Sequence, residues 1–372
     1  SGLGNGPFGF GWSLSLPSIT RKTDKGLPRY QDAIESDVFI LSGSEDLVPV
    51  FKKDSDGNYI RDAKGKLEFD EYQRDGYRIR RYRPRIEGLF ALIERWTRKI
   101  DNDVHWRSIS KDNILTVYGK DEQSRIVDPS DNRRIFSWLI CESHDDKGNA
   151  VVYEYLAENE TGTDLGKANE LNRSRTANRY LKHIFYGNRK PLLLDITRPG
   201  FRKPHTEQAD FSSADWMFEL VFDYGDHDPV SPKPNDYTIK DVTLGLLRYP
   251  WKSRPDPFSS YRAGFEIRTY RLCHRVLMFH HFEGEEGVGN DCLVRSTDLF
   301  YTEDKNPEQA CSPVYTFLKR ITQSGYKRDN GSYLKRSLPP VEFEYSLPIV
   351  QGAVEEVGQT NLENLPTGLD GK

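Results

Sequence analysis

WMFELVFDY, residues 216–224, is the stretch that decides the fold class of this chain. Apolar side chains recur in it at every second position, a spacing that gives a β-strand one apolar face. We therefore expect a central strand here. Its predicted buried face carries Trp216, Phe218, Leu220, Phe222 and Tyr224.

Further strand patterns lie on both sides of this stretch. The clearest are residues 151–156, 293–301, 315–321 and 341–345. Residues 266–282 are long enough for an extended or bent strand, and apolar residues on both of its faces predict cover on both sides. Gly and Asn accept positive φ at little cost, so hairpin turns are expected at 56–58, 147–149 and 330–331. One helix is expected within 158–182.

The composition indicates a folded β protein. The chain has 372 residues, a mean hydropathy of −0.72, and 19 Phe, 20 Tyr and 6 Trp, which is too aromatic for a disordered chain. The net charge of −4 does not suggest a general nucleic-acid or membrane-surface protein. No apolar run approaches the roughly 20 residues that a membrane helix needs.

The cysteines and the chain ends indicate where the protein is made and whether the chain is a fragment. Cys141, Cys273, Cys292 and Cys311 show no CxxC spacing, which favours reduced, buried thiols and synthesis in a reducing cytoplasm. No secretory signal is visible. The start lies in a Gly-rich turn without Met, and residues 359–372 resemble a linker, so we expect a fragment. Exposed sheet edges are then expected at 2–16 and 341–345.

Two glycine-containing motifs fit turns better than ligand sites. Gly4-Asn5-Gly6-Pro7-Phe8-Gly9 matches the dinucleotide pattern GxGxxG, but an alternating strand ending in Pro17 follows it where that motif needs a helix. The stretch 54–58 (DSDGN) resembles the start of a calcium loop, but Tyr59 and Gly65 occupy the positions that require Gly and Glu. A tight turn and a hairpin tip are the better interpretations.

A histidine cluster and an arginine-rich strand are weighed in the same way. His274, His280 and His281 lie near Cys273 and Cys292, but neighbouring residues on a strand point to opposite faces, so His280 and His281 cannot share one ion. Residues 77–86 (YRIRRYRPRI) resemble a nucleic-acid platform. Acidic residues just upstream predict a solvated, salt-bridged face across a hairpin instead: Glu68, Asp70, Glu71 and Asp75.

Two E-x-E pairs keep an enzyme hypothesis open. Glu283/Glu285 and Glu342/Glu344 have the spacing of the glutamate pair of ADP-ribosyltransferase toxins. The second pair occupies the polar face of an amphipathic strand, and the first lies in a Gly-rich loop with no Ser-Thr-Ser stretch upstream. We assign no catalytic, cofactor-binding or metal-binding residue.

Several long blocks resemble the SpvB-like family, which includes the B components of tripartite insecticidal toxin complexes and a Salmonella virulence protein. The blocks are GNGPFGFGWSLSLPSITRKTDKGLPRY (4–30), DVFILSGSEDLVPV (37–50), DPSDNRRIFSWLICESHDDKGNAVVYEYLAE (128–158), RTANRYLKHIFYGNRKP (175–191), YRLCHRVLMFHHF (270–282), CLVRSTDLFY (292–301) and PPVEFEYS (339–346). They cover nearly all of the chain, in order.

The resemblance implies an all-β domain of stacked hairpins over residues 1–350, truncated at its N-terminus, with at most one or two short helices. Residues 351–372 would be a linker toward an absent β-propeller. The segment 145–155 (DDKGNAVVYEY) independently resembles the Tyr-Asp (YD, or RHS) repeats that spiral into hollow shells.

The function implied is structural and non-catalytic: part of a shell that encloses a toxic C-terminal peptide, made in the bacterial cytoplasm and acting outside the cell or in a host. Implied partners are the RHS-repeat C component and, through the propeller, the pore-forming A component, with no cofactor, metal or nucleic acid and no direct membrane insertion. The alternatives are a region of an NAD-dependent actin ADP-ribosyltransferase and a carbohydrate- or surface-binding β module.

Overall fold

A computed structural model describes residues 4–43, 45–86, 88, 90–192, 214–234, 251–302 and 315–346. This part of the chain is almost entirely β, as predicted. Its helices are two short 3-10 turns, η1 (Asp32–Ile34) and η2 (Ala168–Glu170). Neither is long and apolar enough to cross a membrane. The helix predicted within 158–182 is wrong apart from η2, which buries Glu170 in an ion pair where a longer helix would need an apolar stripe.

The N-terminal strands form a closed barrel. Antiparallel pairing runs in order through β3 (Ser18–Arg21), β4 (Phe39–Leu41), β5 (Glu45–Pro49), β7 (Tyr77–Pro84), β8 (Leu92–Arg98), β9 (Val104–Ile109), β10 (Leu115–Tyr118) and β12 (Asp131–His144). It closes where β12 pairs with β3, placing Trp138 opposite Ile19. β6 (Glu71–Arg74) and β11 (Arg125–Asp128) add to β7 and β12. We call this part the ring.

The ring has an aromatic interior. Trp106 and Trp138 are fully buried, and their ring centroids lie 5.0 and 5.8 Å from that of Phe39. These large side chains fill the space between facing strands, so the ring is a packed core and not a pore.

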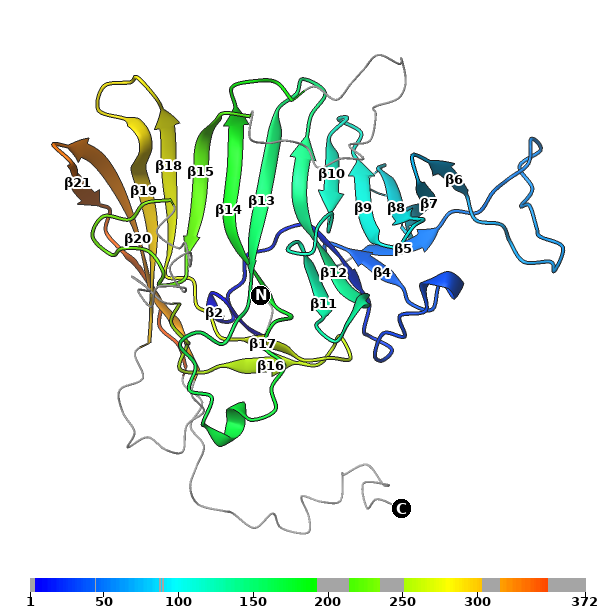
Figure 1. Ribbon diagram of the computed structural model, residues 1–372, viewed down its shortest axis with the longest axis horizontal. Coiled ribbons are helices and arrows are strands. Elements are labelled where there is room, and N and C mark those ends of the chain that lie inside the picture. The colour runs from blue at the N-terminus through cyan, green and yellow to red at the C-terminus, as the bar shows by residue number, and fades with distance from the viewer. Residues whose placement is uncertain are drawn as a thin grey trace, which may run out of the picture.

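From β12 onward the chain forms an open antiparallel sheet. Its strands are β13 (Ala150–Ala157), β14 (Arg179–Asn188), β15 (Trp216–Asp223), β18 (Arg275–Phe282), β19 (Gly289–Tyr301), β20 (Leu318–Asp329), β21 (Ser332–Ser337) and β22 (Val341–Glu342). They stand in one curved row that ends at β21 (Figure 1). The predicted turns at 147–149 and 330–331 are confirmed. β20 begins three residues later than predicted, and β22 ends before residue 345.

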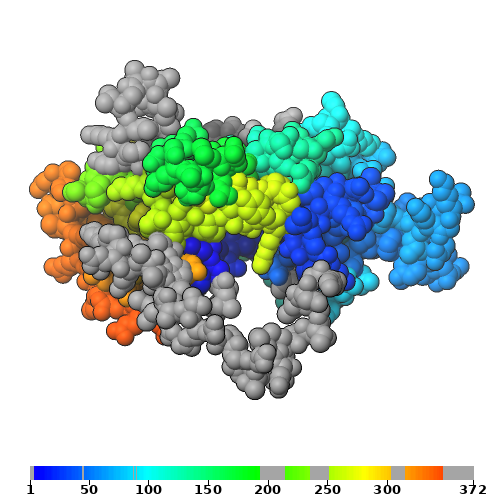
Figure 2. All heavy atoms as spheres, turned by 90° about the horizontal axis from the view of Figure 1, so that it is seen from below, coloured from blue at the N-terminus to red at the C-terminus, as the bar shows by residue number. Residues whose placement is uncertain are grey.

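A short hairpin crosses the lower ends of these strands. β16 (Phe258–Ser260) pairs with β17 (Ile267–Thr269) and runs across the foot of the sheet (Figure 1). Seen from below, it lies beside the segment around η2 and beside N-terminal residues (Figure 2). The single strand predicted over 266–282 is therefore wrong. Residues 270–274 leave the ladder, and β17 and β18 belong to different sheets.

The buried face predicted for residues 216–224 is wrong in part. Phe218 and Leu220 are only half-buried, whereas Glu219 is 4% exposed and Val221 is fully buried on the opposite face. Period two predicted the strand but not its inner face, because Glu219 is buried with histidine partners on neighbouring strands. Toward the end of β15 both faces are buried. Phe222 and Tyr224 are buried on the predicted face, as expected, and Val221 and Asp223 are buried on the other.

The first strands do not form an edge of the large sheet. β1 (Asn5–Gly6) and β2 (Gly9–Phe10) make a separate two-stranded turn. The edge predicted at 2–16 is therefore wrong for the described residues 4–16. The edge predicted at the other end is present among the described strands: β21 and β22 each pair only with β20, and Leu334 and Val341 are each 58% exposed.

Candidate functional site

A buried polar cluster lies where β15 ends. Asp223 Oδ1 accepts hydrogen bonds from the backbone N–H groups of Gly225 (2.8 Å) and Asp226 (3.1 Å), which turns the chain sharply after the strand. Its Oδ2 accepts a hydrogen bond of 2.6 Å from Arg275 Nε on β18. Although burial opposes ionisation, Arg275 holds the pKa of Asp223 below its usual value.

Lys182 anchors the same turn from β14. Its ammonium group is buried and donates hydrogen bonds to Asp226 Oδ2 (2.8 Å) and to the carbonyl of Phe222 (2.9 Å). It also lies 2.8 Å from His227 Nε2. Burial, together with the Lys182 charge, lowers the pKa of His227 to about 4, so this imidazole is neutral at pH 7. Trp251 Nε1 completes the cluster with a bond to Asp226 (2.8 Å).

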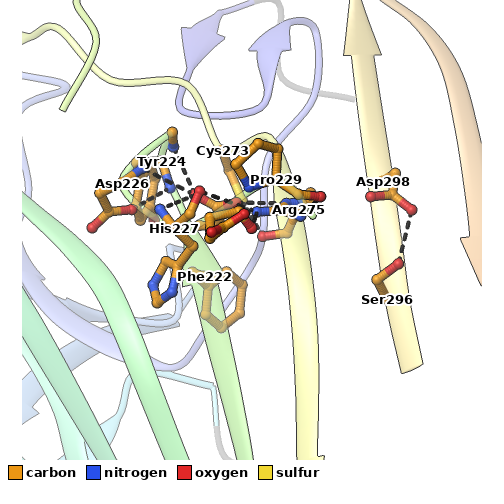
Figure 3. Close-up of polar contacts among 12 residues, drawn as sticks. Phe222, Tyr224, Asp226, His227, Pro229, Cys273, Arg275, Ser296 and Asp298 are labelled. Atoms are coloured by element: carbon orange, nitrogen blue, oxygen red, sulfur yellow. Dashed lines mark hydrogen bonds and ion pairs between the residues drawn. The ribbon is translucent and has the colours of Figure 1, made fainter. Parts of the chain in front are cut away.

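A cavity of about 480 Å³ opens beside this turn. Its charged lining groups include Asp223, Lys252, Arg275 and Asp298. Asp298 accepts a hydrogen bond of 2.8 Å from Ser296 (Figure 3), and Asp223 is held by Arg275. Both carboxylates therefore already have protein partners, and these bonds link neighbouring residues of the sheet. Neither carboxylate is free to act as a general acid or base in the cavity.

A second buried network lies under the sheet. Glu158 accepts hydrogen bonds from Arg271 Nε (2.8 Å) and from the hydroxyl of Tyr180. Arg268 and Tyr270 both donate to Glu170 in η2. The segment 268–271 is thus fastened to the 158–170 segment by buried, charge-assisted bonds.

The GxGxxG stretch forms a turn, as predicted. Arg254 Nη1 donates to the carbonyl of Gly6 (2.8 Å), and Asn5 Nδ2 donates to Asp256 (2.9 Å). Gly9 has φ +85°, and a Cβ at this position would lie 2.8 Å from the carbonyl oxygen of Thr316. Glycine is required there because two backbone segments meet.

The stretch 54–58 is a hairpin tip, as predicted. Asp54 Oδ1 accepts hydrogen bonds from the backbone N–H groups of Asp56 (3.0 Å) and Asn58 (2.8 Å), and Lys53 pairs with Tyr59. The Asp54 carboxylate therefore caps its own turn.

The four E-x-E glutamates lie on the surface. Glu283 and Glu285 occupy the exposed turn between β18 and β19, and Glu342 and Glu344 are exposed at the end of the open sheet. None of them lines the 480 Å³ cavity. The Glu283/Glu285 pair and the Glu342/Glu344 pair lie on different elements of the fold.

The predicted opposition of His280 and His281 is confirmed. His280 packs against the ring of Phe218 at 5.0 Å, whereas His281 Nε2 lies 3.0 Å from Glu219 Oε2 on the other face. Glu219 also lies 2.5 Å from His183 Nδ1. No group of three or more metal-ligating side chains gathers within the described residues. Cys141, Cys273 and Cys292 are buried free thiols, and Cys311 lies outside the described residues.

The arginine-rich stretch 77–86 is salt-bridged as predicted, but only part of it is solvated: Arg83 and Arg85 are exposed. Arg80 binds Glu71 (2.9 Å) across the β6–β7 hairpin, and Arg81 binds Asp70 (3.3 Å). Arg80 and Tyr82 are buried because they point into the ring. Sequence reasoning missed Glu35, which reaches both residues from η1.

Comparisons with known proteins agree on one family. The family model described as "Salmonella virulence plasmid 65kDa B protein" matches residues 1–282. The mono(ADP-ribosyl)transferase SpvB of Salmonella typhimurium is 37% identical over 313 residues, which cover 84% of this chain and 49% of that protein. The chain therefore spans about half the length of the curated relatives it matches.

Two solved structures share the fold. The N-terminal domain of the effector SpvB from Salmonella typhimurium strain LT2 superposes with a TM-score of 0.69 at 36% identity, covering 88% of this chain and 92% of that one. A chain of the TcdB2-TccC3 crystal structure superposes with a TM-score of 0.67 at 30% identity, covering 92% of this chain and 15% of that one.

Proposed function

The chain belongs to the family of the Salmonella virulence plasmid 65kDa B protein, and from this premise we propose that it is a structural, non-catalytic wall segment of a larger toxin assembly. In this role it forms part of a hollow shell around a toxic C-terminal peptide. It also supports a neighbouring propeller.

The observation that carries the proposal is the open sheet. The sheet curves away from a closed ring and ends at β21 and β22 with Leu334 and Val341 exposed (Figure 1). A free edge with exposed apolar side chains is the place where a further strand of a shell adds. The likeness of 92% of this chain to a small part of the TcdB2-TccC3 chain supports a segment of a longer β assembly.

The proposed partners follow from this role. We assign the RHS-repeat C component to the β21–β22 edge, and the pore-forming A component to a propeller beyond a linker at residues 351–372. Residues 351–372 would link the two parts, and they lie outside the described residues. The assembly is made in the bacterial cytoplasm and acts outside the cell or in a host.

Co-expression with the C component of an insecticidal toxin complex tests the proposal. The two chains should co-elute on size exclusion, and the enclosed peptide should resist trypsin. The double variant Leu334→Lys, Val341→Lys should weaken co-elution, whereas Val230→Lys, an exposed loop position, should not. Separate elution of two folded chains contradicts the shell role.

The second candidate is a region of an ADP-ribosyltransferase, because the curated relatives carry that name. Incubation with NAD and actin should give no modified actin if the structural role holds. Transfer that is lost in Glu283→Ala, Glu285→Ala would favour the enzyme instead.

A further inference from the structure

A cavity of about 570 Å³ opens at one mouth of the ring, away from the cluster at the end of β15. Its floor is the apolar ring core, including Val104, Ile135 and Trp138, and its walls come from β7, β8, β11 and β12. A concave space of this size, apolar below and polar at its rim, is typical of small-molecule sites.

The mouth is lined by many charged groups. The lining has six arginines and four carboxylates: Arg21, Arg78, Arg95, Arg98, Arg125, Arg133 and Asp32, Asp101, Asp103, Glu122. Most of these charges neutralise each other. Arg21 binds Asp32 (2.6 Å), and Arg125 binds Asp103 (2.5 Å). Arg95, Arg98 and Arg133 also have acidic partners, so Arg78 is the lining arginine without an ion pair to any described residue.

Arg95 supplies the unused donors. Its side chain is 3% exposed, and its Nη2 donates to Glu35 (2.8 Å). Its Nε and Nη1 are buried and have no hydrogen-bond partner among the described residues. A buried guanidinium donor without an acceptor destabilises the fold, so an acceptor in the cavity would remove that cost.

Arg78 and Thr97 stand beside Arg95 on the same wall. Arg78 lies directly opposite Thr97 in the β7–β8 ladder, and Arg80 lies opposite Arg95. Residues two apart on a strand share a face, so Arg78, Arg95 and Thr97 all point into the ring with Ile93 and Tyr82. Arg78 is half-buried and makes no ion pair with any described residue.

The nearby acids already have several hydrogen-bond donors each. Glu35 accepts hydrogen bonds from Arg80 and from Tyr82 (2.7 Å) in addition to Arg95. Asp32 accepts two from Arg21 (2.6 and 2.9 Å). The guanidinium groups of Arg78 and Arg95 therefore lie on one wall, and only some of their N–H donors are used by these acids.

We propose that this mouth of the ring binds a small organic molecule through an oxyanion, a phosphate or a carboxylate. Arg95 and Arg78 hold the oxyanion, because a guanidinium presents paired N–H donors that match two oxygens of one such group. The apolar part of the ligand packs on the floor around Trp138. This site is independent of the shell role and uses none of the β21–β22 edge.

Calorimetric titration with inorganic phosphate and with acetate, each against chloride at equal ionic strength, tests the site. We expect saturable binding of at least one oxyanion. Binding should weaken about tenfold or more in Arg78→Gln, a loss of about 1.4 kcal/mol. Arg336→Gln on β21, which removes an exposed arginine that has no ion pair with any described residue, should bind as the original chain does.

The outcomes separate cleanly. A stronger response to phosphate assigns a phosphate ligand, and a stronger response to acetate assigns a carboxylate. Arg95→Gln should also lose binding, and if it fails to fold, Arg78→Gln with unchanged circular dichroism decides alone. The proposal is overturned if neither anion binds beyond chloride, or if Arg78→Gln binds as tightly as Arg336→Gln.

Discussion

The ring and the open sheet differ in whether they leave an edge strand with unpaired backbone groups. In the ring, β3 returns to β12, so each strand of the circuit has neighbours on both sides. In the sheet, the row ends at β21 with apolar side chains exposed. A closed circuit satisfies its own backbone groups, whereas an open row leaves N–H and C=O groups that a neighbour must pair.

The two regions also differ in what holds them together. Aromatic rings fill the ring interior, while buried ion pairs such as Glu158–Arg271 and Asp226–Lys182 tie the foot of the sheet to its crossing segments. In the ring the aromatic interior supplies the packing, and ion pairs such as Arg21–Asp32 line its mouth. In the open sheet, directional bonds fix the segments that cross it.

The largest expected effect is in the ring core. Trp138→Ala removes a fully buried side chain and its bond from Nε1 to the carbonyl of Val104 (2.8 Å). It should cost about 3–5 kcal/mol of unfolding free energy, measured by urea denaturation followed by circular dichroism. Leu334→Ala at the sheet edge is the control, and equal losses would mean that the ring is not a closed core.

The next effect is at the foot of the sheet. Arg271→Met leaves the Glu158 carboxylate buried without its cation and should cost about 3 kcal/mol. Adding Glu158→Gln should restore part of the loss, and Arg173→Met, which breaks a more exposed pair with Glu266, should cost under about 1 kcal/mol. If the second substitution restores nothing, the pair does not act as a clamp.

A smaller, pH-dependent effect is expected between β15 and its neighbours. Burial opposes both charges, but the partners prevail: the pKa of His281 is raised from 6.5 and that of Glu219 is lowered from 4.5. The His281 contribution is complete below pH 6.5 and is lost as the pH rises through the folded value. The Glu219 contribution is complete above pH 4.5 and is lost on acidification.

Stabilisation by this pair should therefore be greatest between about pH 4.5 and 6.5. The difference in unfolding free energy between the original chain and Glu219→Gln, about 1–2 kcal/mol, should peak in that window. A difference that is flat from pH 4 to 9 would show that the bridge carries no net charge interaction.

The smallest effect on stability is expected at the free edge. Leu334→Lys should change the unfolding free energy by no more than about 0.5 kcal/mol, because the side chain is exposed. It should nevertheless reduce light scattering at high protein concentration, since charge on an edge strand opposes strand addition. A chain that is already monodisperse at high concentration would show that its edges are protected.

Local pattern predicted elements better than it predicted their burial. Alternation located β15, and Gly and Asn located the hairpin turns, because these signals depend on neighbouring residues. The inner face of β15 was missed because Glu219 is buried with His183 and His281, both distant in sequence. Ring closure between β3 and β12 was also missed, since pairing across such a separation leaves no local signature.

The polar sites were invisible for a related reason. Lys182 looks like an ordinary charged residue in the β14 pattern, and only the fold brings Asp226 and Trp251 to it. Arg95 likewise cannot be recognised as a buried, partly unpaired arginine until the ring is known. A charged residue inside an apolar strand pattern is the one signal that could have marked either position.

β12 pairs with β10 and β11 along one edge and with β3 and β13 along the other. Thr20 and Ser137, which meet across the closing seam, are 117 positions apart in the chain. During synthesis β3 must therefore wait for β12 to leave the ribosome, and the large loop between them makes closure a late, slow step. Until then the first strands are exposed to misassociation, and they are the segment that a chaperone would need to protect.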